Sequence, residues 1–121
     1  MKCKVLIVDD EPDILMTLDF LMRKAGYEVF IGRDGAEAIA LIKEHTPDLV
    51  ILDIMMPNVD GYEVCRFIKQ NTVYQNSKVI FLSAKGKETD VARGYAVGAD
   101  FYIPKPFSSR DLVKKVKELL A

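Results

Sequence analysis

Four short apolar runs in this sequence each end on a residue that could take part in phosphoryl-transfer chemistry. The first run ends on Asp9 and Asp10, and the later runs end on Asp53, Ser83 and Lys105. If the runs are neighbouring parallel strands, these residues lie along the carboxyl edge of one sheet, where open α/β folds bind their ligands. Carboxylates, a hydroxyl and an ammonium gathered there could hold a divalent cation and accept a phosphoryl group.

The sequence around each residue decides how much it contributes to this hypothesis. Asp9 and Asp10 repel each other unless a cation is bound, although a solvated acidic start to a helix would look the same. Asp53 ends a mostly apolar stretch and is not expected to be a simple surface charge; the alternative is a carboxylate that caps the next loop. Ser83 alone resembles an ordinary turn residue, whereas Lys105 lies between two prolines that restrict its direction.

The composition is typical of one globular domain. The chain has 121 residues, 50% of them hydrophobic, and its 17 basic and 18 acidic residues leave a net charge of −1. We expect one domain over residues 1–121, with no direct nucleic-acid binding and no membrane attachment. No apolar run is long enough for a membrane span or a signal peptide, so we expect a cytoplasmic protein. Cys3 and Cys65, which lack the CxxC spacing of a metal or redox site, are consistent with this location. His45 is the only histidine and is expected at the surface, so no catalytic triad can be built.

Strands and helices are predicted to alternate along the whole chain. Buried apolar runs predict strands over residues 5–8, 28–31, 49–52, 79–82 and 101–103. Periodicity and capping residues predict helices over residues 12–25, 34–45 and 88–97, with two more beginning at the caps Asp60 and Ser108. Because strict alternation implies right-handed crossovers, the expected fold class is α/β, with five parallel strands in one sheet covered on both faces.

These motifs, in this order, resemble the receiver domain of two-component response regulators. The resemblance covers essentially the whole chain and is carried by LIVDDE, DLVILDIMMPNVDG, FLSA and GADFYIPKPF. It implies a CheY-like, flavodoxin-like (βα)5 fold, doubly wound with strand order 2-1-3-4-5. It also implies a cis peptide bond between Lys105 and Pro106.

The resemblance further implies a role for each residue at the expected site. Asp53 would be the phosphoacceptor, and Lys105 would pair with a phosphoryl oxygen. Mg²⁺, which Mn²⁺ could replace, would be bound by Asp10, Asp53 and the backbone carbonyl of Met55. Asp9 would act mainly through bound water.

The resemblance also implies how the signal would be transmitted. Ser83 would donate a hydrogen bond to the phosphoryl group, and Tyr102 would move inward with it. The donor would be a sensor histidine kinase or a histidine phosphotransfer protein. A downstream protein or output domain would bind the face formed by the fourth helix, fifth strand and fifth helix. The protein would be a monomer or a phosphorylation-dependent dimer, and it would not be an enzyme beyond self-phosphorylation and slow autodephosphorylation.

Two variable positions next to the site lead to a hypothesis about the lifetime of the phosphorylated state. Met55 and Lys85 would border the path of the water that hydrolyses the acyl phosphate. We expect the apolar Met55 and the long Lys85 to hinder that water. Dephosphorylation no slower than in a Met55→Asn, Lys85→Glu variant would count against this hypothesis.

Other classes of protein fit the sequence less well. A small aspartate-nucleophile Mg²⁺ phosphatase of the haloacid dehalogenase type needs Asp-x-Asp after its first strand, and here Asp9 and Asp10 are adjacent. A flavodoxin-like flavin binder needs a hydroxyl- and glycine-rich phosphate loop there, and VDDEPD would repel a phosphate.

Within the receiver family, two readings stay open: a stand-alone signalling protein, which is favoured if the chain is complete, and the receiver part of a longer DNA-binding regulator. Val91 and Phe101 stand where winged-helix regulators usually place charged dimer contacts, so we expect no dimer of that kind.

Overall fold

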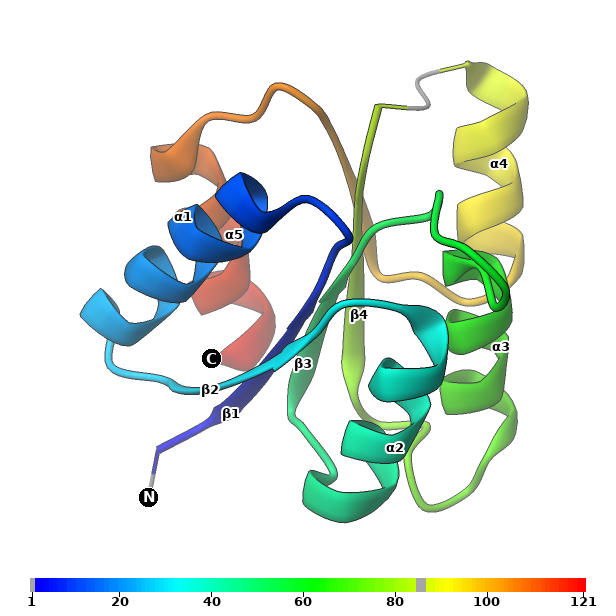
Figure 1. Cartoon of the computed structure of the whole chain (residues 1–121), viewed down its shortest axis with the longest axis horizontal. Coiled ribbons are helices and arrows are strands. Elements are labelled where there is room, and N and C mark those ends of the chain that lie inside the picture. The colour runs from blue at the N-terminus through cyan, green and yellow to red at the C-terminus, as the bar shows by residue number, and fades with distance from the viewer. Residues whose placement is uncertain (1, 85–86) are drawn as a thin grey trace.

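Strands and helices alternate throughout the computed structural model, which describes residues 2–84 and 87–121 (Figure 1). The strands are β1 (Lys4–Val8), β2 (Glu28–Gly32), β3 (Leu49–Leu52), β4 (Lys78–Ser83) and β5 (Phe101–Pro104). The helices are α1 (Pro12–Lys24), α2 (Gly35–His45), α3 (Gly61–Gln70), α4 (Glu88–Ala96) and α5 (Ser109–Leu120). Every element predicted from the sequence is therefore present, in the predicted order.

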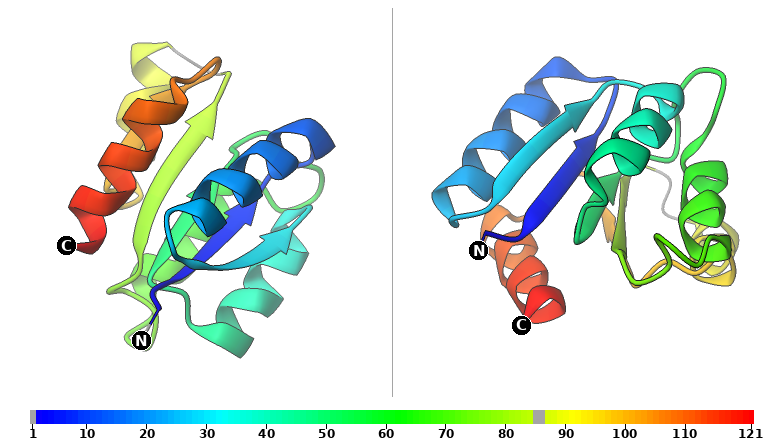
Figure 2. Two further views of the ribbon diagram at one scale, coloured as in Figure 1. Left: turned by 90° about the vertical axis from the view of Figure 1, so that its left-hand side faces the viewer. Right: turned by 90° about the horizontal axis from the view of Figure 1, so that it is seen from below.

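All the strands are parallel and form one sheet in the order β2-β1-β3-β4-β5, which confirms the expected fold class. Helices α1 and α5 cover one face, and α2, α3 and α4 cover the other (Figures 1 and 2). The central strand β3 is buried along its whole length. This is the expected arrangement for an apolar strand that has helices on both sides.

Side-chain caps fix where three of the helices begin. The Asp34 carboxylate accepts a hydrogen bond from the backbone N–H of Glu37 at 2.8 Å, and Asp60 accepts one from Glu63 at 3.0 Å. Ser108 caps α5 in the same way. These caps satisfy backbone donors that a helix leaves unpaired in its first turn, and all three were predicted from the sequence.

The observed boundaries differ from the predicted ones by about one residue. Helices α1 and α4 end at Lys24 and Ala96, one residue earlier than predicted, because the following residues form the C-caps. Strands β2, β4 and β5 extend to Gly32, Ser83 and Pro104. The extra residues carry the strands right up to the side chains at the carboxyl edge of the sheet.

The buried face of α1 is rotated relative to the sequence prediction. Leu15, Leu18 and Met22 are buried, whereas Ile14 and Leu21 are half-buried at the margins of the helix. The spacing of Ile14, Leu18, Leu21 and Met22 in the sequence predicts an apolar face that contains Ile14 and Leu21 and leaves out Leu15. The difference arises because α1 packs against the sheet on one side and lies beside α5 on the other, so part of its apolar surface faces its neighbour.

The two ends of the described chain lie at the amino edge of the sheet, opposite the edge where the strands lead into the acidic residues (Figure 1). This follows from the parallel topology, since β1 begins at that edge and α5 runs back toward it. Within the described residues, no helix has the length and apolar character needed to cross a membrane.

Candidate functional site

Three carboxylates meet at the carboxyl edge of the sheet. β1 and β3 are paired in register, with Val8 opposite Leu52, so the residues that follow these two strands lie side by side. Oxygens of Asp9, Asp10 and Asp53 all lie within 4.8 Å of one another. Asp9 and Asp53 are buried, whereas Asp10 is exposed. The structure therefore brings together the three acidic residues that the sequence analysis selected.

Lys105 follows β5 and reaches the same cluster. Its Nζ lies 2.9 Å from Asp9 Oδ2, 3.3 Å from Glu11 Oε1 and 3.9 Å from Asp53 Oδ2. Its backbone N–H donates to the carbonyl oxygen of the last residue of β4 at 2.9 Å, which holds this loop against the neighbouring strand. The Lys105–Pro106 peptide bond is cis, as expected. The contact with Glu11 was not predicted, although Glu11 directly follows the paired aspartates.

Burial and mutual repulsion change the acidity of these groups. Burial raises the pKa of Asp53 to about 6, with further contributions from the charges of Asp9 and Asp10, and Lys105 opposes the shift. Burial also raises the pKa of Asp9, against the hydrogen bond from Lys105. For Lys105, burial lowers the pKa, but the carboxylates outweigh burial and raise it overall. Among the described residues, the Lys105 ammonium therefore does not offset the effects of burial and mutual repulsion that raise the pKa values of Asp9 and Asp53.

The cluster fits a hard divalent cation. It offers carboxylate oxygens from two adjacent strand ends, and Mg²⁺ prefers oxygen ligands from one or two carboxylates together with water and phosphate oxygens. A cavity of about 270 Å³ lies over the cluster, with Asp10, Asp53, Met55, Ser83 and Lys105 in its lining. Asp53 therefore borders an open space that could admit both a cation and a phosphoryl group.

Ser83 and Tyr102 form a buried pair next to this cavity. Ser83 ends β4 and is fully buried, while Tyr102 on β5 is 7% exposed. Burial raises the pKa of Tyr102, and the neighbouring Ser83 side chain opposes this shift. The Tyr102 ring lies 6.1 Å from the Phe81 ring, centroid to centroid. A Cβ at Gly94 would lie 3.0 Å from the Phe81 ring and 3.3 Å from the Tyr102 ring, so a larger residue there would require these rings to shift by a few tenths of an ångström. Gly94 was not predicted to be important from the sequence, in which it is a single glycine inside a helical pattern.

A second contact missed by the sequence analysis joins α3 to α4. The Tyr62 hydroxyl donates to the backbone carbonyl of Asp90 at 3.1 Å, and the guanidinium of Arg93 lies 4.2 Å from the centroid of the Tyr62 ring. This contact connects the beginning of α4 to α3, the helix that follows the loop after Asp53. Of the two residues in the hydrolysis hypothesis, Met55 is 58% exposed beside the cavity, and Lys85 lies outside the described residues.

Comparison with known proteins identifies the family to which the chain belongs. The model of the response regulator receiver domain matches residues 5–117. A putative response regulator from Chloroflexus aurantiacus is 34% identical, with 99% of this chain and 98% of that chain covered and a TM-score of 0.93. The chemotaxis protein CheY4 of Vibrio cholerae is 30% identical, with coverage of 98% and 99% and a TM-score of 0.92.

A third similar structure is the receiver domain of a signal transduction histidine kinase from Syntrophus aciditrophicus, 36% identical, with 98% of this chain and 89% of that chain covered and a TM-score of 0.90. The chain belongs to the response regulator receiver domain family. It is a CheY-like domain of two-component signalling, as the sequence motifs indicated.

Proposed function

We propose that this receiver domain stores a phosphoryl group on Asp53 and does not turn over a substrate. The observation that carries the proposal is the placement of Asp53, a buried carboxylate within 3.9 Å of the Lys105 ammonium and at the edge of an open cavity. The donor would be the phosphohistidine of a sensor histidine kinase or of a histidine phosphotransfer protein. An oxygen of Asp53 would attack phosphorus while the P–N bond breaks, and the imidazole would leave with the electron pair and take up a proton.

Lys105 is positioned to serve this transfer. In this structure its ammonium is shared among Asp9, Glu11 and Asp53, so it can move to a phosphoryl oxygen without leaving the cluster. The ammonium would stabilise the charge that the phosphoryl group brings into a buried site. Asp10, Asp53 and the Met55 carbonyl would hold Mg²⁺, with Asp9 acting through water, and the cation would supply further charge stabilisation for the phosphoryl oxygens.

Ser83 and Tyr102 would report the change to the surface. The Ser83 hydroxyl would turn to donate to the phosphoryl group, which would change its interaction with the neighbouring Tyr102 side chain. Because Tyr102 packs on Phe81 and close to Gly94 of α4, a change in its position would be felt by α4 and β5. The face formed by α4, β5 and α5 would then bind the downstream protein or output domain.

The same face bears on the oligomeric state. The Lys115 ammonium lies 4.3 Å from the centroid of the Phe101 ring and 3.0 Å from Glu118 of its own helix. These intramolecular partners of Lys115 support the expectation that the chain forms no dimer of the winged-helix kind through this face. Sedimentation with and without beryllofluoride, a phosphoryl mimic, tests this: a monomer in both conditions is expected, and dimerisation through this face would contradict it.

The proposal is tested by phosphorylation with acetyl phosphate and Mg²⁺, measured as the mass increase of the intact protein. The expected product carries one phosphoryl group, is sensitive to hydroxylamine as an acyl phosphate is, and does not form when a chelator is present. Asp53→Asn is expected to abolish it. Asp13→Asn, at an exposed aspartate in the first turn of α1, is the matched control and is expected to be labelled normally.

Labelling that persists in Asp53→Asn would overturn the assignment of the acceptor. Rapid loss of the phosphoryl group from the labelled protein, with steady release of phosphate much faster than slow autodephosphorylation, would overturn the distinction from a phosphatase. The lifetime hypothesis stands as a separate proposal, supported by the exposed Met55 beside the cavity. It is checked by comparing decay of the labelled protein with decay of the Met55→Asn, Lys85→Glu variant.

A further inference from the structure

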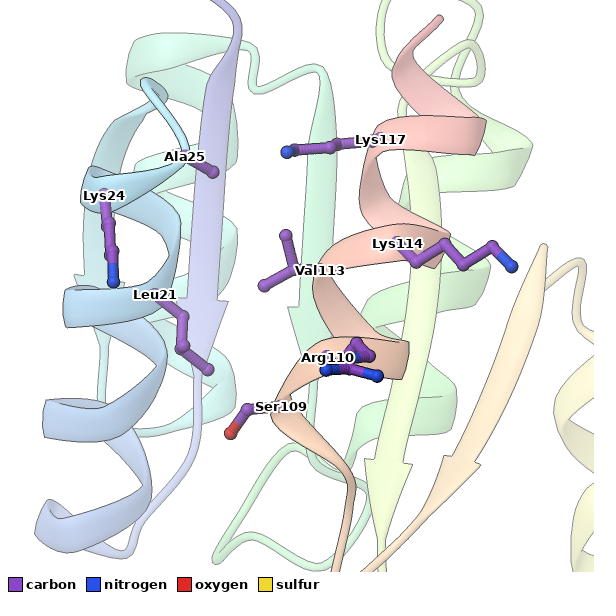
Figure 3. A pocket seen from close by; sticks show the side chains of 8 residues that line it. All are labelled: Leu21, Lys24, Ala25, Ser109, Arg110, Val113, Lys114 and Lys117. Atoms are coloured by element: carbon purple, nitrogen blue, oxygen red, sulfur yellow. The ribbon is translucent and has the colours of Figure 1, made fainter.

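A groove runs between α1 and α5, on the face of the sheet away from α2, α3 and α4 (Figure 3). Its volume is about 550 Å³, within the ~300–1,000 Å³ usual for ligand pockets and larger than the cavity over the acidic cluster. Leu21 and Val113 point toward each other across it, and Ala25 lies at one end. All three are half-buried, so the floor of the groove is apolar and still reached by water.

The groove is bordered by positive charge alone. Lys24, Arg110, Lys114 and Lys117 line it, and no acidic residue does, although the whole chain has a net charge of −1. Lys117 extends from α5 toward α1, while Lys114 points away along the outer flank (Figure 3). All four are exposed.

These four cations make few contacts within the described part of the protein. Lys24 lies 5.7 Å from the centroid of the Phe20 ring. Within residues 2–84 and 87–121, none of the four cations has a carboxylate oxygen within 4.0 Å. The cations Arg110, Lys114 and Lys117 lie three and four residues apart on one helix, a spacing at which like charges repel each other.

We propose that this groove binds an acidic, amphipathic helical segment of a partner protein. Leu21, Ala25 and Val113 would be covered by the apolar face of that segment, and the surrounding lysines and arginine would pair with carboxylates at its margins. The part of α5 that lines the groove runs from Ser109 to Lys117, about 12 Å at 1.5 Å per residue. That length matches about two turns of helix, with apolar residues at i, i+3, i+4 and i+7.

The apolar floor of the groove distinguishes an acidic amphipathic helix from other anionic ligands. A nucleic-acid backbone or a polyphosphate would neutralise the cations but leave Leu21, Ala25 and Val113 in contact with water. A neutral apolar peptide would cover the floor but leave the cations unpaired. An acidic amphipathic helix satisfies both features at once, which is why the charge pattern and the floor together select it.

The test uses ¹⁵N-labelled protein titrated with a synthetic peptide of about 16 residues, long enough to be partly helical alone. The peptide carries leucine at i, i+3, i+4 and i+7 and glutamate at the flanking positions. Saturable shifts are expected at the amides of Leu21, Ala25 and Val113, weakening as salt is added because the ion pairs are exposed. A glutamine-for-glutamate peptide and a serine-for-leucine peptide are each expected to bind at least about tenfold more weakly.

Two protein variants complete the test. Arg110→Glu with Lys117→Glu is expected to weaken binding at least about tenfold, since it replaces attraction by repulsion. Lys43→Glu with Arg66→Glu changes the net charge equally on the opposite face of the sheet, at exposed positions on α2 and α3, and is expected to bind normally. Val113→Ser keeps every charge and is expected to weaken binding through the floor alone. Well-dispersed spectra check that each variant is folded.

Absence of saturable shifts, or shifts that map away from the groove, would overturn the proposal. So would equal binding by the Arg110→Glu, Lys117→Glu variant, or tighter binding of inorganic polyphosphate or a single-stranded oligonucleotide than of the peptide. The groove contains none of the residues proposed to accept or stabilise the phosphoryl group. Labelling by acetyl phosphate therefore fails or succeeds independently of this result, and the charge-reversed variant is expected to be labelled as the unmodified chain is.

Discussion

Replacing the proposed acceptor should make the metal-free protein more stable at neutral pH. Asp53 is buried beside Asp9 and close to Asp10, and among the described residues Lys105 is the only cation within 4.0 Å of its carboxylate. Asp53→Asn keeps the size of the side chain and removes its charge. The variant therefore loses the cost of ionising a carboxyl group in this position.

The size of the effect follows from the pKa of Asp53. Folding raises that pKa from 3.8 to about 6, and each pKa unit corresponds to about 1.4 kcal/mol. Below pH 3.8, both the folded and the unfolded state bind a proton at the Asp53 carboxyl group. Between 3.8 and about 6 only the folded state keeps it, so stability falls as pH rises, and above about 6 the loss is complete. The full loss is about 3 kcal/mol, and we expect Asp53→Asn to recover about 1–3 kcal/mol because an amide fits the carboxylate's position imperfectly.

Urea unfolding from pH 4 to pH 8, without divalent cations, measures this difference. The free energies of unfolding of the two proteins should nearly coincide at the acid end and separate as pH rises, with the variant more stable at pH 7.5. Asp13→Asn is the control, because Asp13 is exposed, and its effect should stay within a few tenths of a kcal/mol at each pH. Mg²⁺ should then stabilise the original protein more than the Asp53→Asn variant, since binding to the folded state raises its stability.

The reasoning would be refuted by a variant that is no more stable than the original at pH 7.5. It would equally be refuted by a stability difference that does not change between pH 4 and pH 8. Either result would mean that burial and neighbouring charge do not act on Asp53 as the geometry requires.

Three further substitutions have definite expected outcomes. Lys105→Met leaves the buried Asp9 carboxylate without its ammonium and should cost about 3 kcal/mol in urea unfolding at pH 7.5, less at acid pH; an unchanged midpoint would contradict the assigned ion pair. Tyr62→Phe removes the hydrogen bond to the Asp90 carbonyl and should cost about 1 kcal/mol, with faster amide hydrogen exchange in α4 and unchanged exchange in α1 as the internal control. Gly61→Ala would place a Cβ against the carbonyl of the acceptor and 2.8 Å from the next Cα, so it should cost about 2 kcal/mol and slow acetyl phosphate labelling; full stability and labelling together would show that the loop yields freely.

Much of the fold could be predicted because local and global signals agree. The buried strand at 49–52 is apolar on both faces, and the caps at Asp34, Asp60 and Ser108 mark helix starts without reference to any distant residue. The acidic cluster was predictable for a related reason. Residues that end adjacent parallel strands must lie near each other, so the strand order implied by the family resemblance predicted that Asp9 lies beside Asp53.

Contacts between helices, and between helices and distant strands, were not predictable in this way. His45 was expected at the surface, yet its ring stacks on Phe30 with centroids 3.8 Å apart, because the end of α2 packs beside β2. The bond from Tyr62 to the Asp90 carbonyl depends on how α3 and α4 lie on the sheet, and no spacing along the chain indicates it. Periodicity predicts which side chains share the apolar face of a helix, but the packing of neighbouring elements determines which of these side chains are fully buried.

The position of the two chain ends has a practical consequence for anyone who wishes to observe this domain at work. Both ends of the described part of the chain lie at the amino edge of the sheet, and the acidic cluster lies at the carboxyl edge (Figure 1). A fluorescent reporter, an affinity tag or a surface tether can therefore be joined at either terminus without crowding the entrance to Asp53. Immobilised through one end, the domain would present its acceptor to solution, which suits it to sensors that record phosphoryl transfer in real time.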